Sequence, residues 1–125
     1  MNAPSKIKLH RDSAELEIQF GAEHYRLSAE FLRVHSPSAE VKGHGPGQAK
    51  LQYGKRLVTI LKLEPVGNYA IKLSFDDGHN TGIYTWDMLR AFCQHKEDYW
   101  REYEEALSLA GLDRDPDTRA VRFVP

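Results

Sequence analysis

Histidines and one glycine-rich segment are the first candidates for chemistry in this sequence. Six histidines occur in the chain, and residues 43–47 read GHGPG. A phosphate-binding loop works through consecutive backbone N–H groups that lead into a helix N-terminus, and Pro46 has no N–H. No Lys-Ser or Lys-Thr pair follows either. We therefore expect a rigid turn that presents His44, not a nucleotide site.

Metal and catalytic sites receive little support from the remaining motifs. His10-Arg11-Asp12 has the spacing of half an iron site, but it precedes the first clearly predicted strand, and the chain is too short for the catalytic folds that use it. The single thiol, Cys93, lies in an apolar helical stretch, where a core position is expected. One cysteine excludes an internal disulfide and a cysteine-rich metal centre held by this chain alone. We expect no enzyme activity, no catalytic residue, no metal and no cofactor.

The charges are balanced overall but segregated along the chain. Seventeen Lys and Arg face 18 Asp and Glu, a net charge of -1, which makes nucleic acid an unlikely partner. Val41–Leu63 nevertheless holds five basic residues and no acid. This basic stretch is a candidate small-ligand or anion site, and the alternative is a solvated loop facing the protein's own acidic helix. Its candidate binding residues are His44, Lys50, Tyr53, Lys55 and Arg56.

The last third of the chain offers two candidates for contact with another protein. Acidic residues gather at Asp98, Glu102, Glu104 and Glu105, a candidate docking face for a basic partner. Aromatic residues recur beside them, and a solvent-facing aromatic patch would be a candidate partner face. Its members would be Tyr99, Trp100 and Tyr103. The alternative is a helix packed on two sides, with these rings in the core.

The elements that must position these residues are short strands and helices. A chain of 125 residues with 41% hydrophobic residues fits one packed domain, placed at residues 10–111 between a flexible arm (1–9) and a flexible tail (112–125). Alternating and helical patterns predict an α+β fold: a small, mainly antiparallel β-sheet built from hairpins, with two or three helices packed on it. Strands are predicted at 14–20, 24–27, 56–65, 69–75 and 81–84, and helices at 29–34, 86–93 and 95–110.

Local signals fix some boundaries. Ser28 and Thr85 are suitable helix N-caps, Ser36-Pro37 ends the first helix, and Gly111 ends the last. A hairpin followed by a helix occurs twice, which is a weak sign of an internal repeat. No apolar run reaches the roughly 20 residues of a membrane span, and no signal peptide is evident at the N-terminus. We therefore expect a cytoplasmic protein with no membrane partner.

Two blocks of sequence resemble a known family. The first runs from Leu32-Arg33 through SPSAEV at 36–41 to GHG at 43–45, and the second reads FDDGHxxGIYxWxxLR at 75–90. Together they resemble the gamma-butyrobetaine hydroxylase-like N-terminal domain family over roughly residues 10–110. The resemblance implies a stand-alone bacterial member of a family long catalogued as a domain of unknown function. Relatives occur as N-terminal domains of carnitine-pathway oxygenases, or attached to P-loop ATPases that carry iron–sulfur clusters.

In the hydroxylases the resemblance implies a structural zinc held by three cysteines and one hairpin histidine. By that correspondence the cysteine positions fall at Ser36, Ser38 and Val41, and only the histidine, His79, is retained. Serine and valine cannot replace thiolates, so this degenerate zinc site is expected to bind no metal. Hydrogen bonds from His79, Ser36 or Ser38 are expected to brace the loop instead, and all three are candidate binding residues.

The resemblance implies a non-catalytic protein-interaction or adaptor module, because no catalytic activity is established for the isolated domain. Its partner would be an unidentified protein, with a possible link to iron–sulfur protein assembly. The alternative is a small-ligand or anion-binding domain that uses the basic stretch Val41–Leu63.

Overall fold

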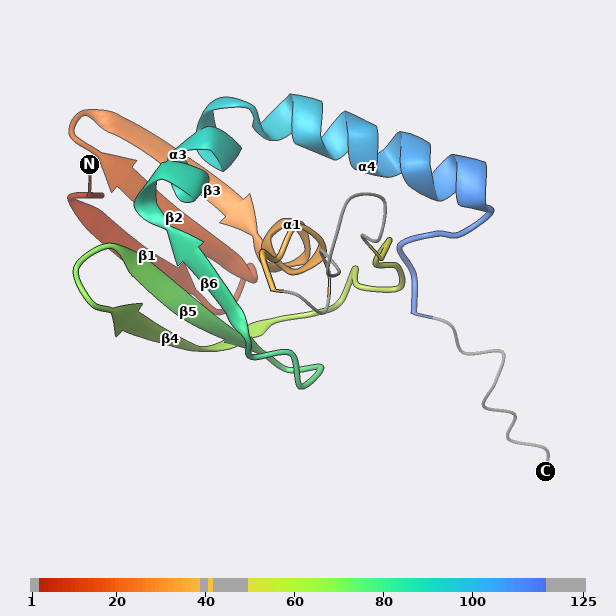
Figure 1. Ribbon diagram of the computed structural model, residues 1–125, viewed down its shortest axis with the longest axis horizontal. Helices are drawn as coiled ribbons and strands as arrows, with labels where there is room; N and C mark the ends of the chain where they lie inside the picture. The colour runs from red at the N-terminus through yellow and green to blue at the C-terminus, as the bar shows by residue number, and fades with distance from the viewer. Residues whose placement is uncertain (1–2, 39–40, 42–49, 117–125) are drawn as a thin grey trace.

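The protein consists of two successive β-hairpin-and-helix units followed by a long helix. A computed structural model describes residues 3–38, 41 and 50–116 (Figure 1). The first unit comprises β1 (Lys6–His10), β2 (Glu15–Phe20), β3 (Glu23–Ser28) and α1 (Ala29–Val34). The second comprises β4 (Ile60–Val66), β5 (Ala70–Phe75), β6 (Gly82–Thr85) and α3 (Trp86–Gln94), and α4 (Lys96–Ala110) follows.

The predicted α+β class is confirmed, with the strands divided between two sheets. Each sheet has three antiparallel strands in sequential order, β1-β2-β3 and β4-β5-β6. Leu16 lies opposite Leu27 in the first sheet, and Ile71 lies opposite Tyr84 in the second. Short hairpins explain this topology, because an antiparallel pair can be joined by a tight turn and needs no crossover.

Both sheets and two helices contribute to one hydrophobic core. Alternation along β2 buries Leu16, Ile18 and Phe20, while β5 buries Ile71 and Leu73 on the same principle. Helix α1 lies beneath α4, and α4 extends along one edge of the molecule (Figure 1). A smaller apolar cluster beneath α4 is formed by Val34, Tyr103 and Leu107.

Hydroxyl caps start the first helix of each unit, as predicted. Ser28 Oγ accepts the Phe31 backbone N–H at 3.0 Å, and Thr85 Oγ1 accepts the Met88 N–H at 3.2 Å. Each bond satisfies one N–H that the helix itself cannot pair. Helix α4 ends at Gly111, whose φ of 68° is the left-handed conformation that glycine adopts without strain.

An arginine joins the two sheets at an irregular point of β4. The pairing of β4 with β5 shifts between Ile60 and Lys62, so Leu61 is an extra residue in the strand. Arg11, from the turn between β1 and β2, donates to the carbonyls of Ile60 (3.4 Å) and Leu61 (3.2 Å). The exposed backbone of β4 is therefore partly paired with a side chain of the other sheet.

The predicted flexible ends are wrong over the residues nearest the domain. Residues 6–10 form β1, whose Ile7 and Leu9 pack against the core; their alternation is visible in the sequence but is shorter than in β2. At the other end, Asp113 and Arg114 accept backbone hydrogen bonds from residues 54 and 56. Residues 117–125 lie outside the described residues. Within the described part, no helix has the length and apolarity needed to cross a membrane.

Candidate functional site

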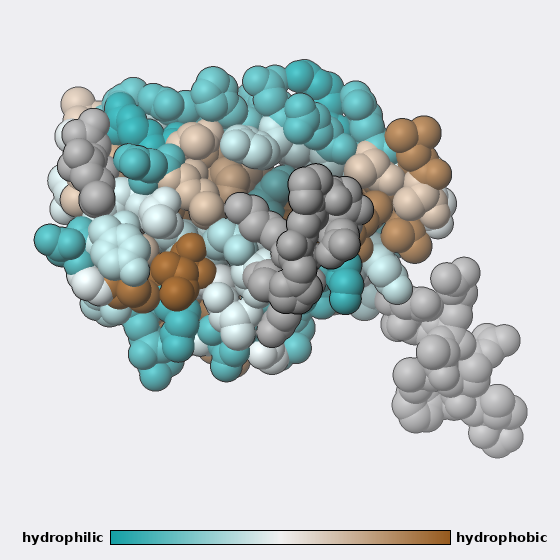
Figure 2. All heavy atoms as spheres, viewed as in Figure 1, coloured by the Kyte–Doolittle hydropathy of each residue, from teal (hydrophilic) through white to brown (hydrophobic). Residues whose placement is uncertain are grey.

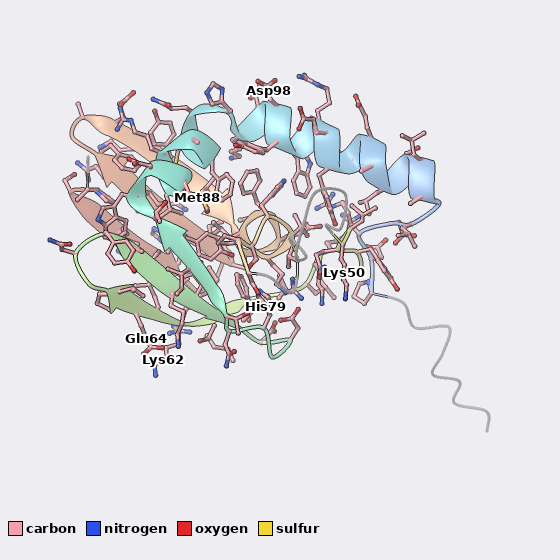
Figure 3. All side chains as sticks on the ribbon, viewed as in Figure 1. Lys50, Lys62, Glu64, His79, Met88 and Asp98 are labelled. Carbon is pink, nitrogen blue, oxygen red and sulfur yellow. The ribbon has the colours of Figure 1, made fainter. Side chains whose placement is uncertain are left out.

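The residues at the family's zinc positions meet where the loop after α1 contacts the β5–β6 hairpin. Ser36 Oγ lies 2.8 Å from His79 Nε2, and Ser38 Oγ lies 2.7 Å from Thr81 Oγ1. Ser36 is 1% exposed and His79 is 6% exposed. Figure 3 shows His79 at the end of the hairpin that faces α1. We call Ser36, Ser38, His79 and Thr81 the serine–histidine junction.

The tip of the hairpin is shaped so that His79 points inward. Asp77 Oδ1 accepts the His79 backbone N–H at 3.1 Å, and the His79 carbonyl accepts the Phe75 N–H at 2.9 Å. Gly82 provides the space for Ser36, because a Cβ on Gly82 would lie 2.5 Å from Ser36 Oγ. A residue other than glycine there would displace Ser36 from its hydrogen bond.

A three-charge cluster lies beside the junction. The Asp77 carboxylate is 2.8 Å from Arg33 Nε and 2.7 Å from Lys55 Nζ. Burial alone would raise the pKa of Asp77, but the Lys55 ammonium, the His79 N–H and the Arg33 guanidinium outweigh burial and lower this pKa to about 2. The same carboxylate therefore orders the hairpin tip and neutralises a buried arginine.

The junction does not fit a zinc ion of the family type. A structural zinc takes four ligands, usually thiolates and imidazoles, whereas Ser36, Ser38 and Val41 offer two neutral hydroxyls and a hydrocarbon. No group of three or more His, Cys, Asp or Glu side chains near enough to hold a metal occurs among residues 3–38, 41 and 50–116. Hydrogen bonds between Ser36 and His79 and between Ser38 and Thr81 link the two elements here.

The Ser36–His79 contact also has the composition of a nucleophile and its base. Its surroundings favour a structural role, because Ser36 is closed off from solvent and the Asp77 carboxylate accepts the backbone N–H of His79, which holds the hairpin tip in place. The one thiol, Cys93, is buried as predicted. Burial raises its pKa to about 12, so the reactive thiolate is disfavoured.

The remaining candidates from the basic stretch do not gather at the junction. Lys55 is bound to Asp77, while Arg56 Nε lies 2.5 Å from Asp115 and lines a separate hollow. Tyr53 is 48% exposed and Lys50 is exposed. His44 lies outside the described residues. Two of the predicted anion-binding cations therefore already contact carboxylates of the protein.

The aromatic residues predicted as a partner face point inward instead, so that prediction is wrong. Tyr103 is 6% exposed and donates its hydroxyl to the Gln52 carbonyl at 2.7 Å. Tyr99 and Trp100 are partly buried and pack against Phe31, with ring centroids 6.2 and 6.3 Å apart. Their spacing on α4 places them over α1, which is the packed-helix alternative.

A second charged site escaped the sequence analysis. Glu30 is 5% exposed, and Arg114 donates to both of its oxygens at 2.7 and 2.8 Å. The two residues are 84 positions apart, so no local pattern connects them. The one available signal was the composition of α1, AEFLRV, in which two charges interrupt a helix that is otherwise apolar.

The exposed side of α4 carries the predicted group of acids. We call this surface the acidic face; its members are Glu97, Asp98, Glu102, Glu104 and Glu105, all exposed. Figure 2 shows hydrophilic side chains gathered over α4, and Figure 3 shows Asp98 on its outer side. One acid is neutralised locally, since Arg101 contacts Asp98 at 2.6 Å.

Comparisons with known proteins agree with this architecture. The family described as "Gamma-butyrobetaine hydroxylase-like, N-terminal" matches residues 7–90. Two solution structures of proteins without further description are similar over the whole of this chain. One is 50% identical, with a TM-score of 0.83 and 99% of its own length covered, and the other is 42% identical, with a TM-score of 0.79 and 95% covered.

A crystal structure is also similar. It is a protein of unknown function of the DUF971 family from Acidithiobacillus ferrooxidans, 37% identical, with a TM-score of 0.59 over 70% of this chain and 89% of the other. No curated protein matches the chain. The family match covers nearly all of both β-hairpin-and-helix units, up to the middle of α3, and the residues of the serine–histidine junction. The chain belongs to the gamma-butyrobetaine hydroxylase-like N-terminal domain family.

Proposed function

We propose that this protein is a non-catalytic interaction module that binds a basic surface of a partner protein through the acidic face of α4. The observation that carries the proposal is the exposure of five carboxylates along one side of a 15-residue helix. By contrast, the hydroxyl and imidazole groups of the serine–histidine junction are buried in contacts that hold the fold together. The feature available to other molecules is then the acidic face of α4 and not a reaction centre.

The charge on the acidic face is only partly balanced from within. Arg101 contacts Asp98, and Lys96 donates to the Arg26 carbonyl at 3.0 Å. Five acids and these two cations leave α4 with an exposed charge of about -3 at neutral pH. A basic partner surface would be steered towards such a helix, and the association would weaken as salt screens it.

Neutralising the acidic face tests this proposal. In the variant E97Q/D98N/E102Q/E105Q the helix keeps its shape but loses four charges. The control D12N/E23Q/E64Q/D87N removes four acids from other surfaces. At low salt, we expect the same proteins to be crosslinked to the unaltered chain and to the control. These proteins should not be crosslinked to the α4 variant, nor to any of the three chains at high salt. Equal capture by the α4 variant would contradict the proposal.

A narrower proposal places the partner in iron–sulfur protein assembly. Its support is the family resemblance, in which some relatives are attached to ATPases that carry iron–sulfur clusters. The proteins captured in the experiment above should then contain iron and acid-labile sulfide in similar amounts. Captured proteins without either would count against this process while leaving the acidic-face proposal intact.

Binding of a small anion is the second candidate function. Arg56 lines a hollow of about 400 Å³, together with Lys96 and Arg114. A ligand that binds only the folded chain raises its thermal midpoint, so phosphate, nucleotides and small carboxylates form the test panel. A shift abolished by Arg56→Gln would support this candidate, and no shift with any member would contradict it.

A further inference from the structure

The C-terminal segment after α4 is bound to the body of the protein through its backbone and bends at Arg114 and Asp115, where the Asp115 N–H donates to Asp113 Oδ1 at 2.9 Å. The Gly54 N–H donates to the Asp113 carbonyl at 3.1 Å, and the Arg56 N–H donates to the Arg114 carbonyl at 2.9 Å. These backbone contacts fix the register of the segment without depending on its side chains. The side chain of Arg114 is thereby directed towards α1.

The Arg114 guanidinium enters a site with the features of specific arginine recognition. Arg114 Nε and Nη2 donate to Glu30 Oε2 and Oε1 at 2.8 and 2.7 Å, a two-armed contact that a lysine ammonium cannot reproduce. The centre of the guanidinium also lies 4.9 Å from the centroid of the Trp100 ring. Carboxylate and aromatic ring thus contact the same group from two sides.

Glu30 requires a cation at this position. Its side chain is 5% exposed, and a buried carboxylate without a partner is strongly unfavourable. Within the described residues, Arg114 is the cation in salt-bridge contact with it. The family match ends at residue 90, so the partner of Glu30 comes from beyond the matched region.

An open hollow lies beside the contact between Arg114 and Glu30, and both residues line it. The hollow has a volume of about 400 Å³, and the residues that line it include Glu30, Phe31, Val58 and Trp100. Arg56, on the same hollow, lies 2.5 Å from the carboxylate of Asp115. Two neighbouring side chains of the bound segment therefore contact oppositely charged residues: Arg114 contacts Glu30, and Asp115 contacts Arg56.

We propose that Glu30, Trp100 and Arg56, at the wall of this hollow, form a recognition site for a bent peptide containing Arg-Asp, a site that the chain's own Asp113–Asp115 segment occupies in this structure. A partner protein that presents the same dipeptide in the same bent form binds there when the segment is displaced. The proposal is independent of the acidic face of α4. The variant used to test that face retains Glu30, Arg56 and Arg114, so either proposal can fail alone.

The direct test uses the full-length Arg114→Ala variant and the peptide acetyl-LDRDP-amide, which copies residues 112–116. We expect the thermal midpoint of the variant to be lower than that of the unaltered chain and to rise with millimolar peptide. The peptide acetyl-LDADP-amide should give no shift. The peptide acetyl-LDKDP-amide should bind roughly tenfold more weakly, because its ammonium cannot span both carboxylate oxygens.

The matched control is the double variant E30Q/R114A, which removes the charge of Glu30 but keeps its shape. Peptide binding to this control as tight as to Arg114→Ala would overturn the proposal, as would equal binding of the arginine and alanine peptides. If Arg114→Ala does not fold, amide resonances of the labelled, unaltered chain provide the readout. Excess arginine peptide should then move the Gly54 and Arg56 signals; unmoved signals would also overturn the proposal.

Discussion

The two β-hairpin-and-helix units begin alike and end differently. In each, a serine or threonine caps a helix by accepting an N–H three residues on, Ser28 in the first unit and Thr85 in the second. All six residues of α1 are buried, whereas α3 buries only Leu89, Phe92 and Cys93. The helix of the first unit is therefore central to the core, whereas the helix of the second unit covers the core with one of its faces.

The positions of the charged residues follow from this difference. Glu30 and Arg33 of α1 are buried, and each is paired with a residue from a remote part of the chain, Arg114 or Asp77. Arg90 of α3 is partly exposed and pairs with the exposed Glu23. Buried charges thus mark where distant segments are fastened to α1, whereas the charge on α3 has water available as an alternative partner.

The largest expected effect comes from truncating equivalent positions of the two helices. Phe31 and Met88 each lie three residues after the cap, but Phe31 is 2% exposed and Met88 is only partly buried. We expect Phe31→Ala to lower the free energy of unfolding by about 3–5 kcal/mol, and Met88→Ala by about 1–2 kcal/mol. Urea unfolding measures both. Equal losses would show that α1 is no more central than α3.

Removing the arginine of each ion pair comes next. Arg114→Ala leaves Glu30 buried without a cation, and because Arg114 is itself partly exposed we expect a loss of about 2–3 kcal/mol. Arg90→Ala leaves Glu23 in water, with a loss below about 1 kcal/mol. Thermal unfolding at low and high salt compares them. A similar cost for both would remove the distinction between buried and surface pairs.

Acid should weaken the two units in separate pH ranges. Burial lowers the pKa of His35, so its stabilising effect is present above the unfolded value of about 6.5 and is lost as pH falls below it. The pKa of Asp77 is lowered to about 2, so its contribution is lost as pH falls from about 4 towards 2. The free energy of unfolding of His35→Gln and of Asp77→Asn, measured across this pH range, isolates each contribution. A pH dependence parallel to that of the unaltered chain would contradict the contribution assigned to the replaced residue.

The two caps should contribute equally, because their hydrogen bonds are local. Ser28→Ala and Thr85→Ala each remove one acceptor for a helix N–H, and we expect each to lower the free energy of unfolding by about 1 kcal/mol. Denaturant unfolding at neutral pH is sufficient. A cost for Ser28→Ala twice that of Thr85→Ala would mean that the central position of α1 amplifies even local contacts.

Chelation should have no effect at the junction between the units. Ser36 and His79 are joined by a direct hydrogen bond, and the residues that the structure describes there do not form a zinc ligand set, so dialysis against a chelator is expected to leave the thermal midpoint unchanged. Metal analysis of the purified protein before dialysis provides the control. Stoichiometric zinc accompanied by a fall in the midpoint would contradict this description of the junction.

Most of the local structure could be predicted from the sequence, and the long-range pairing could not. The bounds of α1 agree with the prediction because Ser28 and Ser36-Pro37 act on the backbone within a few residues. The hydrogen bond between Ser36 and His79 was anticipated through the family resemblance. The division into two sheets and the Glu30–Arg114 pair depend on contacts between segments far apart in the chain, for which one sequence carries no pattern.

The inward direction of the aromatic residues on α4 was ambiguous for a different reason. Tyr99, Trp100 and Tyr103 occupy a wide arc, which fits either a solvent-facing patch or a helix with a broad buried side. Their contacts with Phe31 decide between the two. The acidic residues of the same helix were easier to place, because four of them occur within eight positions and a group of charges is rarely buried.

The contact of Arg11 with β4 has a consequence for behaviour at high concentration. An edge strand with free carbonyls is a template on which other chains add as further strands, the first step towards fibrils. Arg11 occupies two of these carbonyls, at Ile60 and Leu61, and Lys96 occupies one on β3 at Arg26. A cation on one edge strand of each sheet should keep concentrated solutions clear on storage, and replacing Arg11 with alanine should shorten the time to turbidity.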